Sequence, residues 1–184
     1  MKTITNILDK FTQFIGYIAA SAMILMLLNV FYDVVMRYFF KNSSIGMQEM
    51  EWHLFSVVFL FGMAYALKEN GHVRVDMFYD NMHPKWQATI NIIGSIIFIL
   101  PFSLILVKGG YNFAYEAYEL KEMSGDPGGL PHRWIIKSAI ATSFVFLLIA
   151  TLSFVLHNIQ TILSCNKDKC VPDIKEHHHN EEVL

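Results

Sequence analysis

Residues 49–76 read EMEWHLFSVVFLFGMAYALKENGHVRVD, and this stretch decides the fold. Two glutamates open it, sixteen largely apolar residues follow from Trp52 to Leu67, and polar residues then return. Its two histidines, His53 and His72, would stand roughly 28 Å apart at about 1.5 Å of rise per helical residue, which is close to the thickness of a bilayer core. The stretch therefore predicts a membrane-spanning helix whose polar residues lie at its two ends. No single metal or substrate could join those ends.

The rest of the chain agrees with a membrane class. Of its 184 residues, 54% are hydrophobic and 16% are charged, and the apolar residues gather into blocks. A soluble helical bundle would carry charges every few residues on an outward face, but Ile15–Tyr32, Trp86–Val107 and Ser138–Leu156 contain none. We predict an all-α integral membrane protein with four transmembrane helices plus short amphipathic interfacial helices. The expected spans are about 15–36, 50–67, 86–107 and 134–157.

These spans define one membrane domain over residues 1–164. Residues 165–184 are polar, and we expect them to form a disordered cytoplasmic tail. Lys2 and Lys10 precede the first block as in a secretory signal, but Met23–Val35 stays apolar beyond its small residues, which favours a retained span.

Two interfacial helices are expected from apolar and aromatic spacing. Before the first span, Ile4, Ile7, Leu8, Phe11 and Phe14 recur at helical spacing, which predicts a short surface helix before the chain turns into the membrane. After a break at Gly109–Gly110, three tyrosines would form a stripe on an interfacial or partner-facing helix: Tyr111, Tyr115 and Tyr118.

Small residues at four-residue spacing would let helices approach closely, although such residues are common in any membrane helix. The candidate pairs are Gly16 with Ala20, Gly62 with Ala66, and Ala139 with Ser143. Tryptophans at the start of spans are typical of interfacial anchors, and Trp52, Trp86 and Trp134 occupy such positions. Lys and Arg are in small excess in the connections that share a side with both termini, which favours cytoplasmic termini.

The spans lack the midplane charges and broken helices that mark transport pathways, so a solute is not expected to cross this chain alone. Asp33 and Arg37 lie at i and i+4 and can pair with each other. The formal net charge of -2 gives no sign of nucleic-acid binding, and no catalytic motif is present. A metal site is disfavoured, although the residue types occur in His72, Asp76, Asp80 and His83 and in the tail at Cys165, Cys170 and His177–His179.

Four motifs carry a resemblance to a known family. They are Asp33–Phe40 (DVVMRYFF), Gln48–Glu49, Phe61–Leu67 (FGMAYAL) and Gly71–Asp76 (GHVRVD), supported by the later Gly129–Leu130–Pro131 turn. Together they resemble the small, Q-type, four-helix membrane subunit of tripartite ATP-independent periplasmic (TRAP) transporters. The chain departs from the family at Ile45 and Gly46, where an aromatic residue usually stands.

The resemblance implies a non-enzymatic scaffold subunit in a bacterial inner membrane, with both termini cytoplasmic and no cofactor of its own. Its implied partners are a large, elevator-type membrane subunit, which would hold the substrate and sodium sites, and an extracytoplasmic substrate-binding protein. The cargo would be an organic acid such as a C4-dicarboxylate, a keto acid or a sugar acid. Partner contacts or structural roles at the membrane rims are expected of Asp33, Arg37 and Glu49 at the outer rim, of Gly62 within the span, and of Gly71, His72, Arg74 and Asp76 at the inner rim.

Two alternatives from other classes stay open. A haem- or quinone-associated membrane anchor also uses a few helices with histidines, but here His53 and His132 fall at one rim and His72 and His157 at the other. A small self-contained channel or exporter would need an oligomer lined by polar residues. Co-purifying partners would distinguish all three.

Overall fold

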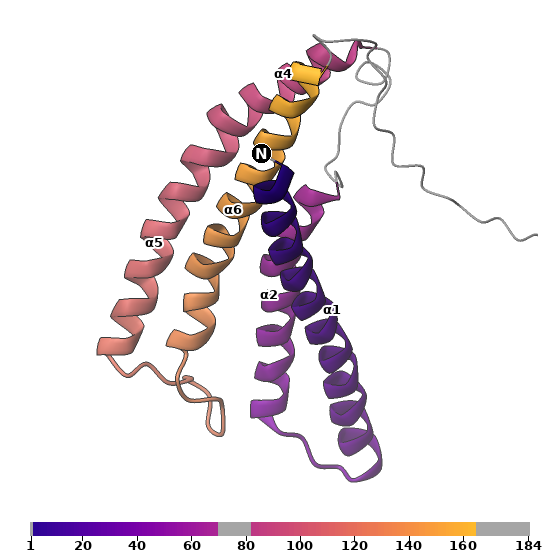
Figure 1. Ribbon diagram of the computed structural model, residues 1–184. Coiled ribbons are helices and arrows are strands. Elements are labelled where there is room, and N and C mark those ends of the chain that lie inside the picture. The colour runs from indigo at the N-terminus through magenta and orange to yellow at the C-terminus, as the bar shows by residue number, and fades with distance from the viewer. Residues whose placement is uncertain (1, 70–81, 165–184) are drawn as a thin grey trace, which may run out of the picture.

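The computed structural model describes residues 2–69 and 82–164, and Figure 1 shows that this part of the chain is helical. Four of its helical segments are long and apolar enough to cross a membrane, and no strand occurs among the described residues. The predicted fold class is confirmed. The elements are α1 (Lys2–Phe39), α2 (Ile45–Lys68), α4 (Pro84–Gly94), the π-helical turn η1 (Ser95–Ile99), α5 (Leu100–Glu119) and α6 (Trp134–Ser164).

The helices form two antiparallel pairs, α1 with α2 and α5 with α6 (Figure 1). We call the end of the bundle that carries residues 39–45 and 119–134 the loop rim. The opposite end, with the start of α1, the end of α2, the start of α4 and the end of α6, is the terminal rim. The two pairs lie together near the terminal rim and diverge toward the loop rim (Figure 1).

Helix α6 is the centre of the bundle, since it packs against α1, α2, α4 and α5. Its contact with α2 is apolar and includes a core cluster of Ala64, Leu67, Phe144, Leu147 and Ala150. Within the most apolar window, 39% of α6 is buried, against 17% or less for the other three spans. The outer helices therefore present most of their apolar surface to lipid or to a partner.

Two of the expected helix boundaries are absent from the structure, the first in α1 and the second in α5. Helix α1 is continuous from Lys2 to Phe39, so the expected separate surface helix is part of the first long helix. Its first turns pack on α6 and do not turn away along a surface: the Phe11 and Phe146 rings are 5.6 Å apart, and Ser153 Oγ donates a 2.7 Å hydrogen bond to Asp9. Where the membrane begins along each helix stays a prediction.

The expected break at Gly109–Gly110 is wrong, because α5 continues through both glycines. A Cβ atom at Gly110 would lie 2.9 Å from the backbone nitrogen of Ala141, so this glycine permits the close approach of α5 to α6. The predicted pair Ala139 and Ser143 on α6 is buried, and its role as a packing seam stays a prediction.

The other two small-residue pairs behave differently. A Cβ atom at Gly16 would lie 2.5 Å from Cδ2 of Tyr65, so Gly16 makes room for that ring between α1 and α2, while Ala20 is exposed. Nothing lies within 4 Å of a Cβ atom at Gly62. Gly62 is therefore not a seam within this chain, and its contact with a partner stays a prediction.

Candidate functional site

The polar groups of the loop rim are organised around one carboxylate, Glu49, on the second turn of α2. Glu49 is only 7% exposed. The hydroxyl of Ser124 donates to Glu49 Oε1, and the backbone N–H of Leu130 donates to Glu49 Oε2 at 2.5 Å. We call Glu49 together with residues 124–130 the Glu49 lock. It joins α2 to the connection between α5 and α6.

The loop of the Glu49 lock is closed by hydrogen bonds of its own. The Ser124 N–H donates to the Leu130 carbonyl at 3.3 Å, and the Gly129 N–H donates to the Asp126 carbonyl at 3.0 Å. The Ser124 hydroxyl also accepts from the Asp126 N–H at 3.2 Å. Both ends of the loop thus meet at the carboxylate, which satisfies donors that the turn itself leaves unpaired.

Two glycines make this approach possible. A Cβ atom at Gly129 would lie 2.4 Å from the Ser124 Cβ and 2.8 Å from Glu49 Oε2, so no larger residue fits there without movement. A Cβ atom at Gly46, in the first turn of α2, would lie 3.3 Å from the Gly128 carbonyl oxygen. The loop therefore approaches the backbone of α2 closely at Gly46.

Two further polar contacts lie near the end of α1, one within that helix and one to the start of α2. Asp33 and Arg37 form the predicted ion pair, in which the Asp33 side chain is 4% exposed and the Arg37 side chain 49%. One turn earlier, buried Asn29 donates from Nδ2 to the Met47 carbonyl at 2.9 Å. The pairing is confirmed, whereas a role of these residues in assembly stays a prediction.

A third group of polar contacts involves charges in the connection after α5 and in the first turn of α6, and sequence reasoning missed it. Glu122 pairs with the Lys137 ammonium and lies 3.9 Å from Arg133. The Arg133 guanidinium carbon stands 5.7 Å from the Trp52 ring centre, and Lys137 Nζ stands 3.9 Å from that of Phe113. The spacing of Arg133 and Lys137, one helical turn apart near a helix start, was the available signal.

These charges border a groove of about 520 Å³ at the point where the helix pairs diverge. Its walls are mainly apolar and come from α2 on one side and α5 and α6 on the other, including Phe55, Phe59, Leu60, Ile136 and Ile140. Both cations at its border are paired to Glu122.

The residues predicted to shape the terminal rim fall between the two described segments of the chain. Gly71, His72, Arg74 and Asp76 lie outside the described residues, as do Asp80 and the two tail cysteines. Of the predicted anchors, Trp86 is 64% exposed in the first turn of α4, Trp52 is 38% exposed on α2, and the Trp134 ring meets that of Tyr118 at 5.6 Å. Their contact with a membrane interface stays a prediction.

The histidines of the described segments do not form a site. His53 Nδ1 lies 2.6 Å from the Glu49 carbonyl oxygen, within its own helix. His132 and His157 are exposed and lie at opposite rims. Over residues 2–69 and 82–164, no group of three or more His, Cys, Asp or Glu side chains is arranged to hold a metal ion.

Several buried hydroxyl groups bond to the backbone of their own helix, whereas Ser153 donates to Asp9 on α1 and the buried Ser103 hydroxyl has no hydrogen-bond partner within the described part of the chain. Ser143 donates to the Ile140 carbonyl and Thr151 to that of Leu147, both at 2.7 Å. Ser95 bonds in the same way to Asn91 at 2.7 Å, and Asn91 in turn donates to Asn158 on α6 at 2.9 Å. These groups are used for helix structure and packing, which leaves them unavailable as a continuous polar path.

Comparison with known proteins shows the family to which this chain is similar. The family described as "Tripartite ATP-independent periplasmic transporters, DctQ component" matches residues 26–161. A Haemophilus influenzae protein named for the TRAP transporter small permease is 26% identical over 157 residues, covering 84% of this chain and 96% of that protein. A C4-dicarboxylate TRAP transporter small permease protein, DctQ, of Vibrio cholerae is 27% identical over 105 residues, or 57% of this chain and 44% of that protein.

The matched region begins in the middle of α1 and ends near the end of α6, so it includes all the polar contacts of the loop rim described above. It also includes all the motifs on which the resemblance was based. The chain therefore belongs to the DctQ family: it is the small permease component of a bacterial TRAP transporter, a multi-pass membrane transport protein and not an enzyme.

Proposed function

We propose that this chain is the fixed scaffold of a sodium-coupled, binding-protein-dependent importer of an organic acid. Membership of the family supports a complex with a large membrane subunit and an extracytoplasmic binding protein. The Vibrio cholerae relative is named for C4-dicarboxylates, and its similarity over 57% of this chain favours a carboxylate cargo, with keto acids and sugar acids as the other candidates. Sodium and substrate would bind to the large subunit.

The observation that carries the scaffold role is the contrast between paired polar groups and unpartnered apolar faces. At the loop rim, Glu49, Asp33 and Glu122 are each held by a partner within the chain. Meanwhile the apolar side chains of α1 and α5 are widely exposed, as at Phe31 (68%) and Ile105 (70%). Such helices suit burial against another membrane protein and surrounding lipid, and not the lining of a solute path.

We assign the terminal rim to the cytoplasm and the loop rim to the extracytoplasmic side. The small excess of Lys and Arg on the terminal side supports this orientation. In this arrangement the Glu49 lock faces the compartment from which the binding protein delivers its cargo, and residues 70–81 connect two spans inside the cell.

The test is co-expression of the tagged chain with the large membrane subunit of the same transporter, followed by purification in mild detergent. We expect a one-to-one complex. Proteoliposomes containing that complex and the loaded binding protein should accumulate labelled organic acid only with an inward sodium gradient, and neither subunit alone should transport. Repeated recovery of the chain as a monomer or homo-oligomer, or transport by this chain alone, would contradict the scaffold role.

A further inference from the structure

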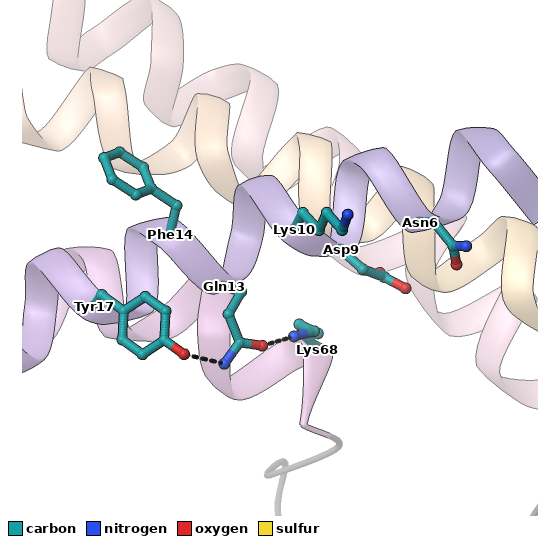
Figure 2. A pocket seen from close by; sticks show the side chains of 7 residues that line it. All are labelled: Asn6, Asp9, Lys10, Gln13, Phe14, Tyr17 and Lys68. Atoms are coloured by element: carbon teal, nitrogen blue, oxygen red, sulfur yellow. Dashed lines mark hydrogen bonds between the residues drawn. The ribbon is translucent and has the colours of Figure 1, made fainter.

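A polar pocket of about 400 Å³ lies at the terminal rim, on the side of the bundle where the start of α1 passes the end of α2. Figure 2 shows that all but one of its lining residues come from α1, and that Lys68 reaches it from the last turn of α2. The polar lining side chains are Asn6, Asp9, Lys10, Gln13, Tyr17 and Lys68.

A chain of hydrogen bonds holds the Lys68 ammonium in this pocket. Lys68 Nζ donates to Gln13 Oε1, and Gln13 Nε2 donates to the Tyr17 hydroxyl at 3.4 Å (Figure 2). The Lys68 side chain is only 16% exposed, and within the described part of the chain it forms one ion pair, 3.6 Å long, with the neighbouring Glu69. An ammonium group has three donors, so Lys68 keeps capacity for a further anionic partner.

The second cation of the pocket is less engaged. Lys10 is exposed and forms no salt bridge within the described part of the chain. The one carboxylate that lines the pocket, Asp9, accepts a 2.7 Å hydrogen bond from Ser153 on α6. The apolar groove at the loop rim differs, since both of its cations are paired to Glu122.

The pocket also lies at the level along the bundle where we expect lipid headgroups. Lys68 directly follows the apolar run from Trp52 to Leu67, so we expect its ammonium to lie where the second span leaves the hydrocarbon. On α1, the polar side chains give way toward the middle of the helix to Phe14 and Tyr17, which are 59% and 63% exposed. Cations and amides at one end and exposed aromatic rings at the other form an amphipathic site.

We propose that this pocket binds one phospholipid of the leaflet that meets the terminal rim. Its phosphodiester would lie between Lys10 and Lys68, with the Gln13 amide as a further donor, and one acyl chain would run along Phe14 and Tyr17. Such a lipid would join the start of α1 to the end of α2. A soluble anion would use the cations but would leave the exposed aromatic surface uncovered.

The experiment is native mass spectrometry of the full chain, alone and in its complex, after delipidation and titration with phosphatidylglycerol. We expect one lipid per chain to be retained by the native protein. Lys10→Gln and Lys68→Gln should each weaken that binding by roughly tenfold, which is the loss of one charge-assisted contact. The matched control is Lys41→Gln, which removes the same charge at the exposed loop rim and should change nothing.

Two outcomes would overturn the proposal. Unchanged retention in both Lys10→Gln and Lys68→Gln would show that the pocket is not the lipid site, and Lys10→Gln decides this safely because its side chain holds no ion pair within the described part of the chain. Displacement of the lipid by excess inorganic phosphate, with phosphate itself retained, would identify a soluble-anion site. Neither result depends on transport, so failure here and failure of the scaffold role are distinguishable.

Discussion

The Glu49 carboxylate and the Leu130 backbone amide are joined by a 2.5 Å hydrogen bond across 81 residues of sequence. This bond connects the first pair of helices to the second at the rim where the pairs diverge (Figure 1). The contact of α2 with α6 is apolar and lies deeper in the bundle. The Glu49 carboxylate therefore supplies the polar contact that joins the two helix pairs where they diverge. Its removal should loosen the loop before it unfolds the helices.

Replacing Glu49 with alanine should therefore release residues 124–130. Leu130 N–H and the Ser124 hydroxyl would both lose their acceptor, and a hydrogen bond to a charged group contributes enough that amide exchange should accelerate about tenfold or more. Hydrogen–deuterium exchange mass spectrometry of this loop measures the effect. Glu49→Gln should be intermediate, since it keeps one oxygen acceptor.

Glu51→Ala is the control for this experiment, because it removes a carboxylate two residues away that is outside the Glu49 lock. It should leave exchange in the loop unchanged. Equal acceleration in Glu51→Ala and Glu49→Ala would mean that local charge, and not the lock, protects the loop.

A methyl group at Gly129 should open the same lock from the loop side. In Gly129→Ala the new Cβ atom would meet Ser124 Cβ at 2.4 Å and Glu49 Oε2 at 2.8 Å, so the loop must shift, at a cost of about 1–3 kcal/mol in unfolding free energy. Gly125→Ala is its matched control, as nothing lies within 4 Å of that Cβ. Thermal unfolding of the two purified variants should differ in this order, and similar midpoints would argue against the packing.

The helices could be predicted from sequence, whereas the Glu49 lock could not. Uncharged blocks long enough to cross a bilayer allow few folds, because backbone groups in lipid must bond within a helix or a closed barrel. The ion pair of Asp33 and Arg37 could also be predicted from sequence, since residues at i and i+4 lie on the same face of a helix. Gly129–Leu130–Pro131 was recognisable as a turn, but the composition of a turn does not show which carboxylate binds to it.

The double glycine of α5 shows a second limit of sequence reasoning. Locally, Gly109–Gly110 favours a helix break, because glycine has a low helix propensity. In the structure, Gly110 is buried against α6 and helix α5 continues, so packing between helices overrides the local preference. Whether a glycine here breaks the helix or permits close packing depends on the position of Ala141 on α6, which local sequence does not give.

Loss of Asp33 should affect assembly more than substrate recognition. Asp33→Ala would leave Arg37 without its carboxylate at the end of the first span, while neither side chain belongs to a solute path in our proposal. We expect a lower yield of the complex with the large subunit and a melting temperature lower by several degrees, with little change in the KM for transport. Glu116→Ala, which removes an exposed carboxylate in the last turn of α5 and lies outside the Glu49 lock, is the control. A changed KM with normal assembly would assign the pair to substrate recognition instead.

The neighbouring glycines of α5 provide the sharpest test of the helix packing. In Gly110→Ala the new Cβ atom would lie 2.9 Å from the Ala141 nitrogen and 3.2 Å from its Cα, and these backbone atoms can move only if α5 and α6 separate. We expect a loss of about 1–3 kcal/mol in unfolding free energy. In Gly109→Ala nothing lies within 4 Å of the Cβ atom, so the better helix propensity of alanine should leave stability equal or raise it by up to about 1 kcal/mol. Unfolding of the full chain in mixed micelles, followed by circular dichroism, measures both. If both substitutions lowered stability equally, α5 would be sensitive to any added methyl group and the close approach at Gly110 would not be its cause.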